Sequence, residues 1–123
     1  MKGDDNMKIE EIGDKLVEFM LEKKSISFVN INRFFAEQEV EYHGDKAIAL
    51  DKDHPNILRW INWNDFAIDV YDYAMKKLGD KVEINTCAPL IYAIDGCILT
   101  IPVAKSIRNY KNERWLPVIM EVR

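Results

Sequence analysis

Near the start of the chain, apolar residues recur every three or four positions, at Ile9, Ile12, Leu16, Phe19 and Met20. This spacing places them on one face of an α-helix. Glutamates fall in the first turn and lysines in the last turn, where each sign of charge matches the helix dipole. The pattern predicts a helix over residues 7–24. Residues 1–6 are polar and are expected to form a disordered tail.

The most regular helical pattern lies in the middle of the chain. Its apolar face consists of Trp63, Phe66, Ala67, Val70, Ala74 and Leu78. Lysines fall in the last turn and Gly79 suits the position after a helix end, so a helix is predicted over residues 63–78. The opposite face carries an acidic stripe of three residues at positions i, i+4 and i+7: Asp65, Asp69 and Asp72.

Between these two helices the apolar runs are shorter. Residues 25–29 (SISFV) are rich in β-branched and aromatic side chains and predict a brief strand. Asn30 is a favourable helix N-cap, and the apolar residues after it predict a helix over residues 31–39. Residues 46–50 (KAIAL) predict another short strand.

The last third of the chain has the patterns of strands. Residues 81–85 alternate, and two apolar runs joined by an Asp-Gly pair predict a hairpin over residues 90–101, because this pair favours the positive φ of a two-residue turn. Both faces of that hairpin are largely apolar, so a second layer or a partner is expected to cover them. A final strand is predicted over residues 114–123, where Pro117 favours an edge or a bulge.

Length and composition limit the class of protein. The chain has 123 residues, of which 48% are apolar and 31% are charged. This is enough for one hydrophobic core and too little for two ordinary domains, so a single α+β domain is expected over residues 7–123. No apolar run reaches the roughly 18 residues of a membrane helix, and the two cysteines, Cys87 and Cys97, fit a reducing compartment. We therefore predict a cytoplasmic protein without a membrane partner.

Positive charge is concentrated near the C-terminus of an acidic chain. The formal net charge is −4, yet residues 101–123 hold five basic and two acidic residues, which gives +3. Residues 1–50 and 51–100 carry −4 (7 basic, 11 acidic) and −3 (5 basic, 8 acidic). Any contact with a polyanion is therefore expected to be local rather than due to the overall charge.

The segment 105–114, hereafter the basic loop, is the candidate for such a contact. Its candidate binding residues are Lys105, Arg108, Tyr110, Lys111 and Arg114. Cations neutralise phosphates and aromatic rings stack on unpaired bases, so this composition predicts salt-sensitive nucleic-acid binding with little sequence specificity. The alternative is a solvated loop, with Trp115 turned into the core as the start of a strand.

The predicted order of helix, short strand, helix, longer helix and hairpin resembles that of winged helix-turn-helix domains over residues 7–102. The resemblance implies a winged-helix-like α+β fold of three helices followed by a small antiparallel sheet, here with an extra C-terminal strand. It also implies that the third helix enters the major groove and that the hairpin, or wing, touches the nucleic-acid backbone. The acidic stripe stands where groove-reading helices carry Arg, Lys, Asn or Gln.

No motif predicts catalysis or a cofactor. His43 and His54 lie near Asp45, Asp51 and Asp53, but their spacing is not that of a metal site. The five glycines form no phosphate-binding loop, and neither the serines nor the cysteines stand in the setting of a nucleophile. We expect no enzyme activity, no cofactor and no bound metal.

Two functions remain. The first is a small non-catalytic protein that acts in DNA or RNA transactions, contacts nucleic acid through the basic loop and has a protein partner. The alternative is a pure protein-interaction module, such as an adaptor or inhibitor. Its interface would contain the acidic stripe, and also Trp60 if that side chain is exposed rather than part of the core. Self-association as a homodimer, through an edge strand or the hairpin face, is also expected.

Overall fold

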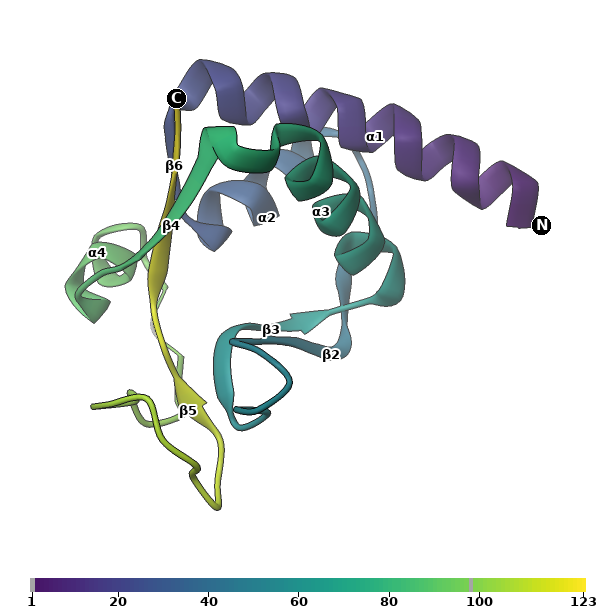
Figure 1. Cartoon of the computed structure of the whole chain (residues 1–123). Coiled ribbons are helices and arrows are strands. Elements are labelled where there is room, and N and C mark those ends of the chain that lie inside the picture. Colours follow the sequence, from purple (N-terminus) through teal and green to yellow (C-terminus); the bar gives the residue numbers. More distant parts are fainter. Residues whose placement is uncertain (1, 98) are drawn as a thin grey trace.

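A computed structural model describes residues 2–97 and 99–123, with side chains from Met7 onward (Figure 1). The described helices are α1 (Lys2–Lys23), α2 (Phe28–Glu37), α3 (Asp65–Leu78) and α4 (Pro89–Ile94), with a short 3-10 helix, η1 (Gly79–Lys81). The described strands are β1 (Ser25–Ile26), β2 (His43–Ala49), β3 (Ile57–Trp63), β4 (Val82–Thr86), β5 (Arg114–Trp115) and β6 (Val118–Val122). The predicted α+β class is confirmed. None of the described helices is long and apolar enough to cross a membrane.

The first sheet has the strand order β1-β6-β4 and is antiparallel throughout. Its central strand, β6, alternates buried and more exposed side chains, with Val118, Met120 and Val122 in the core. The predicted strand over residues 114–123 is in fact two strands, β5 and β6, in different sheets. Pro117 lies between them, where it has no N–H to donate to a strand ladder.

The second sheet has the strand order β2-β3-β5. Strands β2 and β3 are antiparallel with several register shifts, whereas β3 and β5 are parallel over two residues each. Strand β3 is not predicted by the sequence pattern, because Trp63 also has helical spacing from Phe66. The boundary is set by Asn64, whose side chain accepts a 2.8 Å hydrogen bond from the amide of Ala67 and caps α3.

Helices α1 and α3 pack against each other at the top of Figure 1. At their contact, a Cβ atom added to Gly13 would lie 2.2 Å from Cδ1 of Tyr73, so the approach requires glycine. The Tyr73 hydroxyl donates to Asp14 at 2.8 Å, and Lys77 reaches the same carboxylate at 3.1 Å. These bonds lower the pKa of Asp14. Helix α1 begins at Lys2, inside the segment predicted to be a disordered tail.

Helix α2 begins earlier than predicted, because Ser27 is its N-cap. The Ser27 hydroxyl accepts a 3.1 Å hydrogen bond from the amide of Asn30, and the Asn30 side chain accepts a 2.8 Å bond from the amide of Ser27. Asn30 therefore takes part in the cap as the third helical residue, not as the N-cap itself. The predicted strand over residues 25–29 is limited to the two residues of β1.

An aromatic cluster fills the core between the helices and the two sheets. The ring of Phe28 stacks on Trp60 and meets Trp63 edge-on, with both centroid distances at 5.6 Å. Tyr92 of α4 is completely buried, and burial raises its pKa. Its hydroxyl donates to the carbonyl of Val118 at 2.7 Å and accepts from the amide of Phe28 at 3.2 Å. These two bonds connect α4 to β6 and α2.

The predicted hairpin over residues 90–101 is wrong, because its first arm is helix α4. The Asp-Gly pair ends this helix: the amides of Gly96 and Cys97 donate to carbonyls of the last turn at 2.9 and 3.0 Å, and Gly96 has φ +81°. A positive φ serves a helix end as well as a hairpin turn, and Pro89 is suited to a first helical turn. Ile98, in the predicted second arm, lies outside the described residues.

Candidate functional site

Backbone hydrogen bonds hold both ends of the basic loop. On its N-terminal side, the amide of Ala104 donates to the carbonyl of Trp115 at 2.8 Å, and the amide of Trp115 donates to the carbonyl of Pro102 at 2.7 Å. On its C-terminal side, the amide of Arg114 donates to the carbonyl of Asn56 at 2.7 Å. The residue before the loop is therefore bonded to β5, and the last residue of the loop is the first of β5. It is drawn yellow-green at the end of the molecule opposite to α1 (Figure 1).

Asn56, directly before β3, supports the middle of the basic loop. Its side-chain amide donates to the carbonyl of Tyr110 at 2.7 Å and to the carbonyl of Lys111 at 3.3 Å. The sequence pattern does not single out Asn56, since the first of these bonds joins residues 54 positions apart. With this support the loop is fixed at its ends and near its centre.

Tyr110 closes the first half of the loop on itself. Its hydroxyl accepts hydrogen bonds from the amides of Lys105 and Ser106, both at 3.2 Å, and donates to the carbonyl of Ser106 at 3.0 Å. The backbone of Ser106, followed by smaller contributions that include Arg108, lowers the pKa of Tyr110 to about 8. The phenol is thus held in a polar, cation-rich setting.

The ring of Tyr110 also brings two cations together. The guanidinium carbon of Arg108 lies 4.8 Å from the ring centroid, and that of Arg114 lies 5.0 Å from it. Both distances are within the range of a cation–π contact. The ring is therefore already covered in part by the chain's own side chains, so its first role is to position these two arginines.

The predicted binding residues converge on two adjoining hollows in the surface. The first has a volume of about 280 Å³ and is lined by Lys105, Arg108, Tyr110 and Arg114, together with Pro102 and Val103. Lys111 lines the second, of about 530 Å³, and Arg114 borders both. All five predicted residues are therefore neighbours in space as well as in sequence. The sequence pattern does not single out the other lining residues, which are Pro102 and Val103 in the first hollow and Asn56, Ile101, Pro102, Asn112 and Glu113 in the second.

The cations of the basic loop have no ion-pair partner among the residues that the structure describes. The described ion pairs involve Lys15, Arg33, His43, His54 and Lys77. Within the loop, four basic residues and Glu113 give a net charge of +3. The lysines near the end of α3 do not extend this surface, because that end of α3 lies under α1, on the other side of the molecule (Figure 1).

The predicted protein-interface residues fall into two groups. Trp60 is 3% exposed and packs in the aromatic core, so its side chain is not available to an interface. Asp65, Asp69 and Asp72 are all exposed on α3. Partial burial, and then the neighbouring Asp69, raise the pKa of Asp72. Trp115, next to the basic loop, is 1% exposed and belongs to the core, as the alternative interpretation of this segment expects.

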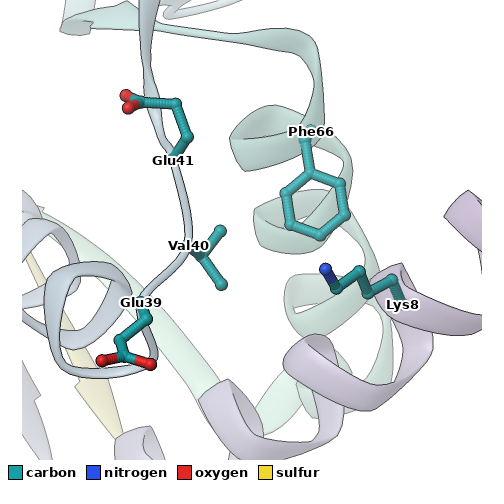
Figure 2. Close-up of a pocket in the computed structure, with 5 residues that line it drawn as sticks. All are labelled: Lys8, Glu39, Val40, Glu41 and Phe66. Atoms are coloured by element: carbon teal, nitrogen blue, oxygen red, sulfur yellow. The ribbon is translucent and has the colours of Figure 1, made fainter.

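A separate pocket of about 240 Å³ lies between α1, α3 and the segment that joins α2 to β2 (Figure 2). Val40 and Phe66 face each other across it, and the amine of Lys8 points into the same space. The carboxylates of Glu39 and Glu41 point away from Phe66. With one amine directed inward, this pocket lacks the pairing of acid, base or nucleophile that a reaction needs.

The histidines are held by nearby carboxylates. His43 lies 3.0 Å from Glu41 and His54 lies 2.7 Å from Asp51. The pKa of Glu41 is lowered by the backbone amide of His43 and then by its ring, and the pKa of Asp51 is lowered by the hydrogen bond with the His54 ring. In the part of the chain that the structure describes, no group of three or more His, Cys, Asp or Glu side chains is placed to hold a metal ion.

No protein-family model, curated protein sequence or solved structure matches this chain.

Proposed function

We propose that this protein contacts nucleic acid through the basic loop and acts, without catalysis of its own, in DNA or RNA transactions together with a protein partner. One observation carries the proposal: Lys105, Arg108 and Arg114 line a single hollow, and no ion pair among the described residues neutralises them. Three like charges around one surface hollow attract an anion, and most strongly at low salt. A phosphate is such an anion.

The support beneath the loop favours such a contact. Asn56 and the Tyr110 hydroxyl hold the loop backbone, and the Tyr110 ring holds two of the guanidinium groups. Binding to a surface that is already ordered costs less conformational entropy than ordering a loose chain. Contacts of this kind with phosphates position a protein on nucleic acid but carry no sequence information, so low specificity is expected.

A winged-helix-like arrangement is part of the proposal. Helices α1, α2 and α3 and strand β1 follow one another in the order of that superfamily, and the antiparallel pair after the third helix is β4 with β6. The segment between these two strands, residues 87–117, then takes the place of the wing and contains the basic loop. Strands β2 and β3 and helix α4 are additions. The exposed acidic stripe makes α3 unsuitable for entry into a groove, so the wing is the proposed contact.

The proposal is tested by fluorescence anisotropy with short single-stranded and duplex oligonucleotides at low and moderate salt. A double variant, Lys105→Glu with Arg108→Glu, is expected to lose binding and keep its melting temperature, because both side chains are exposed. The matched control, Lys76→Glu with Lys81→Glu, makes the same change of charge at two exposed positions elsewhere and is expected to keep most of the affinity. Absence of binding by the unmodified protein at low salt refutes the proposal, as does an equal loss in both variants.

A pure protein-interaction module is the second candidate, favoured by one observation on α4. Leu90, Ile91 and Ile94 are 66%, 41% and 74% exposed on this short helix, an unusual set of apolar side chains to leave in water. Together with the acidic stripe, they would serve an adaptor or inhibitor that binds no nucleic acid. Self-association through such a face stays a prediction, and a monomer by light scattering over a range of concentrations rejects it.

A further inference from the structure

Three hollows adjoin one another along the basic loop. The cationic hollow is the one lined by Lys105, Arg108 and Arg114. The polar hollow, which Asn56, Lys111 and the acidic Glu113 line, shares Pro102 and Arg114 with it. A third, the apolar hollow, has a volume of about 310 Å³ and shares Val103 and Lys105 with the cationic hollow. The cationic hollow therefore adjoins both of the others, and the three adjoining hollows are together called the track.

The apolar hollow differs from its neighbours in chemistry. Most of its lining is apolar, from Cys87, Val103, Ala104, Ile107, Leu116 and Pro117, and its polar residues are Thr86, Lys105 and Ser106. Two of the apolar residues, Val103 and Ile107, are 37% and 59% exposed. Exposed apolar side chains directly beside a cluster of cations suit a ligand that has a flat apolar part next to an anionic part. A nucleotide unit has this combination.

We propose that the track binds one unpaired nucleic-acid strand, with a phosphate in the cationic hollow and the base of an adjacent nucleotide in the apolar hollow. Lys111 and Arg114 then contact the next phosphate at the polar hollow. This inference rests on the proposed function and names its substrate class. A base within a duplex is stacked and paired, so it cannot turn into a hollow beside its own phosphate without loss of those contacts.

Tyr110 has a positioning role in this track. An aromatic side chain in a single-strand site usually offers its ring to a base. Here Arg108 and Arg114 lie over the ring, and the hydroxyl is bonded to the loop backbone. The apolar surface for a base is provided instead by Val103, Ile107 and their neighbours in the apolar hollow.

The test compares three labelled probes at low salt: a single-stranded oligothymidylate, an abasic strand with the same number of phosphates, and the duplex of the first probe with its complement. The base-bearing strand is expected to bind about tenfold more tightly than the abasic strand, the order expected when one base is buried against apolar side chains. The duplex is expected to bind less tightly than the base-bearing strand. Equal affinity for the base-bearing and abasic strands, or tighter binding of the duplex, overturns the inference but leaves the proposed phosphate contact intact. If no probe binds, both the proposed function and this inference fail.

Two matched variants locate the base. Ile107→Ala removes an exposed apolar side chain from the apolar hollow, whereas Ile94→Ala removes one of similar exposure from α4, outside the track. Ile107→Ala is expected to weaken binding of oligothymidylate several-fold and to leave binding of the abasic strand unchanged. Ile94→Ala is expected to change neither, and both variants should keep the wild-type melting temperature. The inference is wrong if Ile107→Ala leaves the preference for the base-bearing strand intact, or if Ile94→Ala removes it equally.

Discussion

Removal of one cation from the basic loop should change the salt dependence of binding by a calculable amount. Lys111 is exposed and has no ion-pair partner among the described residues, so Lys111→Gln removes a charge without an evident effect on folding. On a single strand, each phosphate contact contributes about −0.7 to the slope of log affinity against log salt. Four cations therefore give at most about −2.8, and three give about −2.1.

Measurements from about 50 to about 200 mM salt convert these slopes into affinities. The unmodified protein is expected to lose about 50-fold in affinity over that range, and Lys111→Gln about 20-fold. Anisotropy titrations at several salt concentrations give both slopes. Lys76→Gln, which removes an exposed cation from the far end of α3, should keep the wild-type slope. A slope that Lys111→Gln leaves unchanged, or that both variants reduce equally, would refute the assignment of the contact to the basic loop.

Other predictions concern the loop tyrosine and the core. The pKa of Tyr110 is lowered to about 8, and its ionisation adds a negative charge beside Arg108, Arg114 and Lys105. The affinity for an oligonucleotide should therefore fall as the pH rises through 8. In anisotropy titrations of Tyr110→Phe, this fall should be absent. The same lowered pKa contributes to the stability of the folded chain at high pH. This contribution is complete above the ordinary pKa of 10.0 and is lost as the pH falls through about 8. Melting curves of the wild type and of Tyr110→Phe at several pH values would measure it. Tyr92→Phe leaves the backbone groups of Phe28 and Val118 without their buried partner and should lower the free energy of unfolding by about 1–3 kcal/mol in urea titrations; an unchanged midpoint would contradict this. Gly13→Ala forces the Tyr73 ring away from α1 and should cost about 1–3 kcal/mol in the same assay, whereas a stabilised variant would show that the ring moves at no cost.

Helices α1 and α3 could be predicted because each has a long apolar face at helical spacing. In α3 the cap and the final glycine also agree with that pattern, since Asn64 bonds to the first turn and Gly79 has φ +54° at the end. Such elements are specified by many residues at once. The predicted start differs from the observed one by two residues in α3 (63 against 65) and by five in α1 (7 against 2), but each helix is in place.

The hairpin and strand β3 could not be predicted because short apolar runs fit more than one structure. The Asp-Gly pair after α4 satisfies a helix end as well as a turn, and burial of Tyr92 against Val118 favours the helix. In β3, Trp60 and Trp63 are three residues apart, as on a helix, and both are buried in the aromatic core. Contacts with distant residues decide between these structures, and the local sequence does not contain them.

Part of the candidate site could also be predicted from the sequence, and part of it could not. Its five polar and aromatic residues are visible in the sequence as a basic segment of an acidic chain, and the structure brings them together. The support from Asn56 and the apolar hollow around Ile107 are not visible there, because they depend on how β3 and β5 are paired. The charge of the surface could therefore be predicted, but its shape could not.

The most direct measurement is the change of backbone amide NMR shifts on titration with single-stranded oligothymidylate at low salt. If the convergent cations form the binding surface, the largest changes will fall on Lys105, Ser106, Arg108 and Tyr110, with smaller changes at Asn56, and the amides of α1 will keep their positions. Shifts that are largest on the acidic face of α3 or on α4, or no shifts at all, would contradict the account.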